Sequence, residues 1–116
     1  TALLENRWRI VEVIYEGEPV KFDATQPIYI SFDPVGTLNI FADCPGGAYL
    51  IEAQDENHYK LTSGMFSAVQ CKDEVTTQFD NVLSALKTTT EYKFQNEQLL
   101  LIGRDTKIAL EMDNPR

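Results

Sequence analysis

Residues 38–49, LNIFADCPGGAY, decide the fold, because they hold a strand, a sharp break and the start of a second strand. Residues 38–41 are apolar with partial alternation, which is typical of a half-buried strand. The sequence Pro45-Gly46-Gly47 then ends the pairing, since proline has no N–H and glycine reaches positive φ. An extended run resumes directly afterwards. Two strands separated by so short a break indicate an antiparallel sheet.

The rest of the chain contains similar short extended segments separated by polar turns. One turn, residues 33–36, has Asp, Pro and Gly at the first, second and fourth positions that a tight turn favours. The first strand alternates imperfectly, so either both of its faces are covered or a β-bulge shifts its register. Residues 63–70 are harder to assign, and one interpretation is that they run extended across one end of the sheet. The sequence predicts eight strands, at residues 7–15, 27–32, 38–41, 48–53, 58–62, 91–95, 98–102 and 107–112.

One segment has the period of a helix. Its apolar residues follow the spacing i, i+4, i+7, i+8 and i+11, which forms one stripe of an amphipathic helix: Val75, Phe79, Val82, Leu83 and Leu86. We therefore expect a helix at about residues 73–87. The predicted fold class is mainly β (α+β): a curled antiparallel sheet of about eight strands forming an open or cracked barrel, with the helix packed on it. Residues 1–116 are predicted to form a single domain.

The charge of the chain limits the classes of partner. The 116 residues carry a formal net charge of −8, with a sequence pI near 4.5. Nucleic acids require a basic face, and anionic membrane surfaces attract basic segments, so neither partner is expected. No apolar run approaches the roughly 20 residues of a membrane span.

The two cysteines stand at structural boundaries. Cys44 lies in the break after the third predicted strand, and Cys71 lies just before the helix. We expect them to meet as a disulfide or a close thiol pair that ties the sheet to the helix. Their separation of 71 − 44 = 27 residues would give a disulfide roughly 3–4 kcal/mol of stabilisation. The neighbouring residues Asp43, Pro45, Gly46 and Gly47 form the predicted structural loop.

The sequence offers few residues with the spacing of a chemical site. Two cysteines and the single His58 lack the four ligands of a zinc site, and the polar turn at residues 55–57 lacks the spacing of a calcium loop. Neither cysteine has a histidine nearby to activate it. No phosphate loop, nucleophile elbow or dinucleotide fingerprint is present. We therefore predict no catalytic residue, no metal site and no cofactor.

Large apolar side chains are expected in two places. The predicted core anchors are Trp8, Phe32, Phe79, Leu83 and Leu101. A second group of aromatic residues alternates along the strands, and an exposed patch formed by some of them would indicate a protein or peptide contact. The residues of this second group are Tyr15, Tyr29, Phe41, Tyr49, Tyr59 and Tyr92.

The order of these features resembles the META domain family, which includes the heat-shock-inducible lipoprotein HslJ. The resemblance covers residues 7–112. It departs from the family pattern at Asp43 and Pro45, which replace the usual Gly and Asn, in a shorter loop and in a longer Met-to-Cys segment. The residues that carry it are Trp8, residues 28–32, Gly36, the 43–45 loop with Gly47 and Tyr49, Thr62 or Ser63, Met65, Cys71, Glu74, Phe79, Leu83, and the strand motifs at 99–101 and 108–110.

The resemblance implies a bacterial, export-linked and often lipid-anchored domain without an established catalytic activity. Some family members are connected with heat shock, antibiotic resistance or secretion. We therefore expect a monomeric, non-enzymatic domain of the cell envelope, either periplasmic or at the surface, that contacts another protein or a small apolar ligand. Membrane attachment would come only from an upstream lipid anchor. The alternatives are a hydrolase-like enzyme with a cleft near Cys44 and a purely structural module of a larger lipoprotein.

Overall fold

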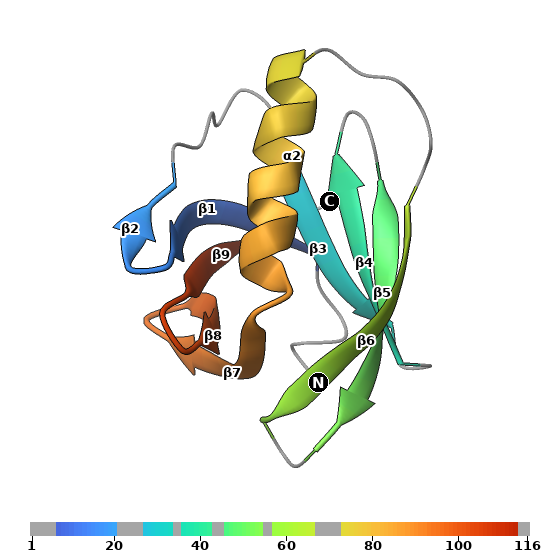
Figure 1. The fold of residues 1–116 in the computed structure, drawn as a ribbon. Coiled ribbons are helices and arrows are strands. Elements are labelled where there is room, and N and C mark those ends of the chain that lie inside the picture. The colour runs from blue at the N-terminus through green and yellow to red at the C-terminus, as the bar shows by residue number, and fades with distance from the viewer. Residues whose placement is uncertain are drawn as a thin grey trace.

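The computed structural model describes residues 7–20, 27–33, 36–42, 46–54, 57–66 and 73–113. Within these residues it contains one helix and nine strands (Figure 1). The bounds are β1 Arg7–Tyr15, β2 Glu18–Pro19, β3 Ile28–Asp33, β4 Thr37–Ala42, β5 Gly47–Ala53, β6 Tyr59–Phe66, α2 Asp73–Leu86, β7 Thr89–Gln95, β8 Gln98–Gly103 and β9 Lys107–Asp113.

All nine strands belong to one antiparallel sheet, in the order β6-β5-β4-β3-β1-β9-β8-β7, with the short β2 paired to β1. The sheet curls so that its two ends, β6 and β7, approach each other. Among the described residues, the β-pairing between these ends is a single bridge between His58 and Glu91, beside a hydrogen bond of 2.9 Å from the Tyr92 N–H to the Asn57 carbonyl. The sheet is therefore not closed into a barrel, and the predicted open, curled sheet with one packed helix is confirmed.

The concave face of the sheet carries the core, as the alternation of the strands dictates. Ile28, Ile30 and Phe32 of β3 are buried, while the residues between them are only partly covered. In β1 the register shifts between Ile10 and Glu12. This bulge brings both Ile10 and the later Val13 to the core side, which explains the imperfect alternation of the first strand.

Helix α2 packs on this concave face with its apolar stripe (Figure 1). Phe79, Val82, Ala85 and Leu86 are buried, and Leu83 is partly buried against the same core. Trp8, Phe32 and Leu101 are buried in that core as well. The helix ends at Leu86, one residue before the predicted end.

Two threonine hydroxyls donate hydrogen bonds to backbone carbonyls at the end of α2. Thr89 Oγ1 donates to the Leu86 carbonyl at 2.8 Å, and Thr88 Oγ1 donates to the Ala85 carbonyl at 2.8 Å. Since each hydroxyl has one proton, each must accept its second hydrogen bond. Thr89 Oγ1 accepts from the Tyr59 hydroxyl at 2.6 Å, which ties the helix end to β6.

Thr88 Oγ1 accepts from the Thr106 hydroxyl at 2.7 Å, which ties the same helix end to the turn between β8 and β9. The Thr89 hydroxyl thus supplies a donor to a carbonyl of the last helical turn, and the Thr88 hydroxyl adds a second donor to the Ala85 carbonyl, which also accepts from the Thr88 N–H at 3.0 Å. Gly103 also lies against this end, so close that a Cβ there would overlap the Thr88 carbonyl oxygen.

Two parts of the sheet differ from the sequence prediction. Strand β6 continues to Phe66, beyond the predicted end at residue 62, and β2 was not predicted. The two ends of the predicted turn at residues 33–36 are joined: the Gly36 N–H donates to the Asp33 carbonyl at 2.9 Å, and Gly36 has a φ of +99°, which favours glycine.

Candidate functional site

The predicted sulfur pair lies outside the described residues. This holds for Cys44 and Cys71, and for Asp43 and Pro45 of the predicted structural loop. Gly47 is described, and it pairs with Phe66 across β5 and β6. A Cβ at Gly47 would overlap the Phe66 ring, so the glycine lets this ring lie across β5. There the ring packs edge-on against Tyr49 and Phe79, at centroid distances of 5.2 and 6.3 Å.

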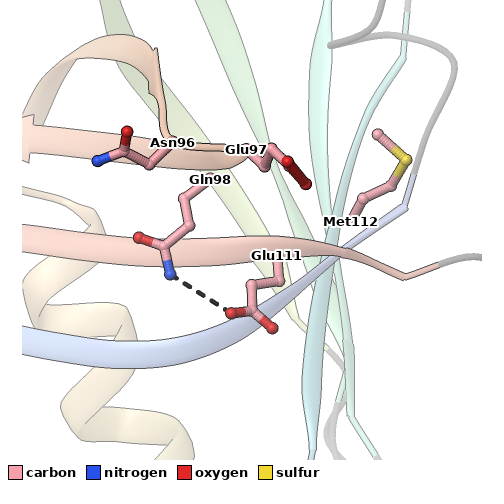
Figure 2. Close-up of a pocket in the computed structure, with 5 residues that line it drawn as sticks. All are labelled: Asn96, Glu97, Gln98, Glu111 and Met112. Carbon is pink, nitrogen blue, oxygen red and sulfur yellow. Dashed lines mark hydrogen bonds between the residues drawn. The ribbon is translucent and has the colours of Figure 1, made fainter.

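One surface hollow lies at the tip of the β7–β8 hairpin, lined by Asn96, Glu97, Gln98, Glu111 and Met112 (Figure 2). Its Glu111 carboxylate is already engaged by the fold. Gln98 Nε2 donates to Glu111 Oε2 at 3.4 Å, and Arg9 pairs with Glu111 Oε1 at 3.3 Å. The polar groups of this hollow therefore serve the hairpin and its neighbouring strands.

A second hollow lies where β6 and β7 meet. Its lining residues are Gln54, His58, Tyr59, Lys60 and Thr90. His58 Nε2 lies 3.9 Å from Glu91 Oε2, in an ion pair that forms when the imidazole is protonated. Burial raises the pKa of Tyr59 to about 12, against the lowering effect of its hydrogen bond with Thr89. Tyr59 is therefore a neutral phenol at physiological pH and acts as a donor to Thr89 rather than as a base.

The described part of the chain holds no cluster of three or more His, Cys, Asp or Glu side chains that could bind a metal ion. In the same part, every buried side-chain nitrogen or oxygen has a hydrogen-bond partner. Burial also raises the pKa of Tyr49, whose ring is in the core. The buried polar groups are thus committed to the fold.

The convex face of β4, β5 and β6 carries an apolar surface. Phe41, Leu50 and Met65 are 46%, 47% and 73% exposed. Phe41 follows the buried Ile40 and Leu50 follows the buried Tyr49, so both point away from the core. Met65 shares their face because it pairs with Ala48, the residue before Tyr49. Ala48 lies between them, because it pairs with both Met65 and Asn39 and stands two residues from Leu50. We call Phe41, Ala48, Leu50 and Met65 the β4–β6 patch.

The β4–β6 patch differs from the exposed aromatic patch that the sequence allows. Of those six aromatic residues only Phe41 is well exposed, whereas Tyr49 and Tyr59 are buried. The ring of Tyr29 lies under the Arg7 guanidinium, at 4.4 Å from its centroid. Leu50 and Met65 were missed. The alternation Tyr49-Leu50-Ile51 indicates an outward Leu50, whereas Met65 lies in the segment for which the sequence predicts only an extended course, without a face.

A smaller exposed apolar region lies on the concave side. Phe94 and Met112 are 49% and 50% exposed. Phe94 packs near Trp8 and Tyr92, at centroid distances of 5.9 and 6.0 Å. Met112 is the Cα partner of Trp8. These residues extend the core, and they provide controls for the β4–β6 patch.

The sequence pattern of the META domain matches residues 1–114. The chain belongs to the META domain family. None of the curated proteins matches its sequence. Within the described residues, this META domain has no helix with the length and hydropathy that crossing a bilayer requires.

Solved structures share the fold of this META domain at low sequence identity. A protein from Burkholderia xenovorans, determined by NMR, has a TM-score of 0.74 and 13% identity, over 99% of this chain and 86% of its own. A DUF4847 family protein from Bacteroides vulgatus has a TM-score of 0.67 and 15% identity, over 98% of this chain and 96% of its own. These likenesses show the fold alone. The family match and the second neighbour indicate a small domain whose activity they leave open.

Proposed function

We propose that this META domain is a non-catalytic domain of the bacterial cell envelope, which binds another protein through the β4–β6 patch. The observation that carries the proposal is the exposure of Phe41, Leu50 and Met65 on one face of three adjacent strands. Contiguous exposed apolar side chains on a soluble domain are typical of a protein contact. The family resemblance is what supports the envelope location and a link to stress.

Two further features favour a binding role over catalysis. Aliphatic and aromatic side chains of the sheet and of α2 fill the concave face. The volume between sheet and helix is therefore taken up by packed side chains. The two hollows lie at strand ends, and Glu111 and Tyr59 in them hold neighbouring strands or the helix end. As far as the described residues go, a small apolar ligand is less favoured for the same reason, because such ligands enter concave apolar pockets.

The proposal is tested by site-specific photo-crosslinking in the native host. The full-length protein carries p-benzoylphenylalanine in place of Met65, and a matched protein carries it in place of Met112, which is 50% exposed on the other side of the sheet. We expect a discrete adduct with one protein from position 65 and not from position 112. The Leu50→Lys substitution should abolish that adduct. The same adducts from both positions, or none from positions 41, 50 and 65, would contradict the proposal.

The envelope location has a separate test. Fractionation of the host should recover the full-length protein with the envelope, and its precursor should carry an export leader, with a lipidated cysteine if the domain is anchored. Recovery in the cytosol from a precursor without a leader would refute this part. It would leave the binding surface open to the crosslinking test.

A further inference from the structure

Strand β6 is unusual among the strands of the sheet in having five consecutive exposed residues. Residues 62–66 are exposed on both faces of the strand, whereas β3 alternates between buried and half-buried positions throughout. Among the described residues, the segment from Leu61 to Phe66 pairs with β5 and with no other strand. Its second edge therefore presents backbone N–H and C=O groups that no described strand pairs with.

The same segment lacks the features that normally block a sheet edge. Residues 61–66 have the sequence LTSGMF, without a charged residue or a proline. Natural edge strands are commonly protected by charges, prolines or a covering element. β6 as a whole has one charged residue, Lys60, at its start, whereas β7 at the opposite end of the sheet carries Glu91 and the exposed Lys93 within the strand. β6 is thus the edge that an additional strand can use.

The surroundings of the edge indicate the chemistry of its partner. Phe66 ends the strand against Phe79 of α2, so the helix lies beside this part of β6. The exposed Asp80 follows Phe79 in the helix, the helix sequence has no lysine or arginine, and the whole chain carries a charge of −8. An acidic neighbourhood attracts basic segments and repels a second copy of this chain.

We propose that an extended segment of another protein, with lysine or arginine among alternating apolar residues, pairs with β6 at residues 61–66 as a further strand of the sheet. The backbone supplies the affinity, as in other cases of β-strand addition. Met65 belongs both to this edge and to the β4–β6 patch, so the added strand continues the patch. The inference rests on the proposed function and names the surface and the kind of partner.

The edge is tested directly with synthetic peptides and the ¹⁵N-labelled protein. The probe is the acetylated and amidated peptide KVTVKVTV. Its controls are EVTVEVTV and a KVTVKVTV peptide with alternate backbone nitrogens methylated, which removes the donors of one edge. We expect amide exchange to slow by about tenfold with the basic peptide, and not with either control, at those of residues 61–66 whose N–H points away from β5. The amides of residues 91–95, on the other edge, should not change.

Three results would overturn strand addition: no protection at residues 61–66 at millimolar peptide, equal protection by the methylated peptide, or protection of β7 instead. A cellular arm separates this inference from the proposed function. Ser63 is exposed at the centre of the edge, so Ser63→Lys and Ser63→Asp should both fold, with native Trp8 fluorescence as the check. Ser63→Lys should weaken the position-65 crosslink by at least about fivefold, and Ser63→Asp should preserve it. Unchanged crosslinking in Ser63→Lys would refute strand addition and leave the proposed function standing, whereas no adduct in the wild type would refute the proposed function.

Discussion

The hydroxyl relay from Tyr59 through Thr89 to the Leu86 carbonyl makes a quantitative prediction for the stability of the domain. Both hydroxyl-bearing residues are buried, with exposed fractions of 5% and 1%. Tyr59→Phe removes one hydrogen bond while Thr89 still donates to Leu86. We expect a loss of about 1 kcal/mol in the free energy of unfolding, the usual net value of one such bond.

Thr89→Val has a larger expected effect, because it keeps the shape of the side chain but removes both hydrogen bonds of the hydroxyl. The Leu86 carbonyl loses its side-chain donor, and the buried Tyr59 hydroxyl loses its acceptor. Leaving such groups without partners should cost about 2–3 kcal/mol. In the double variant no tyrosine hydroxyl is left without an acceptor, so its cost should fall short of the sum of the single costs by about 1 kcal/mol.

The assay is urea unfolding followed by the fluorescence of Trp8, the only tryptophan and a buried one. The matched control is Thr90→Val, the same substitution at the neighbouring exposed position, with an expected cost under about 0.5 kcal/mol. Equal costs for Thr89→Val and Thr90→Val would refute the reasoning. Strictly additive single and double variants would show that the two side chains are not coupled.

The remaining predictions concern the pH dependence of Tyr59, the backbone contact at Gly103 and one ion pair. The pKa of Tyr59 is about 12 in the folded chain against its usual value of 10.0. The stability that depends on the neutral phenol is therefore complete below pH 10 and is lost as pH rises toward 12, by about 1.4 kcal/mol per pH unit. Urea unfolding should show the advantage of about 1 kcal/mol of wild type over Tyr59→Phe vanish near pH 11 and reverse above it, and a constant advantage would contradict the assignment. Gly103→Ala should lower the free energy of unfolding by about 2–3 kcal/mol, since its Cβ would overlap the Thr88 carbonyl; Gly46→Ala, whose Cβ would lie 3.2 Å from its nearest atom, should cost less, and the reverse order would refute the argument. Asp113→Asn should cost about 0.5–1 kcal/mol by removing the ion pair with the partly exposed Arg7, and urea unfolding at increasing salt should show that difference shrinking; a cost that salt does not alter would argue against an ionic origin.

The sequence predicts the elements that depend on local chemistry. Alternation in the β3 segment and the Asp-Pro-x-Gly turn after it predict a hairpin, and the structure contains it. The 3.6-residue period predicts α2 to within one residue at its end. The two-residue β2 carries no periodic signal, so only its pairing with β1 defines it. The sequence leaves the end of β6 open because residues 62–66 lack a buried face to create alternation.

The candidate surface was harder to predict than the fold, because it depends on how strands pair. Phe41 and Tyr49 both lie in strands that the sequence predicts. Phe41 is exposed on the surface, whereas Tyr49 is buried in the core with 5% of its surface exposed. Parity within each strand decides this, and a register shift opposite Leu50, between Tyr49 and Ile51, sets which β6 residues face outward. Such a bulge is a property of the pair of strands, so a single segment cannot reveal it.

The helix explains why, within the described part of the chain, one edge of this sheet has no partner strand. Near His58, β6 and β7 are joined by a backbone bridge, and the Tyr59–Thr89 hydrogen bond adds a side-chain link. Farther along β6, the strand contacts α2 through side chains, because Phe66 packs on Phe79 of the helix. Paired strands lie about 4.8 Å apart, whereas packed layers lie about 10 Å apart, so a helix can cover side chains without reaching the hydrogen-bonding groups of an edge. A helix that completes the core in this way leaves the backbone of residues 61–66 for a strand from elsewhere, and blocking that edge should therefore affect binding while leaving the core and its stability intact.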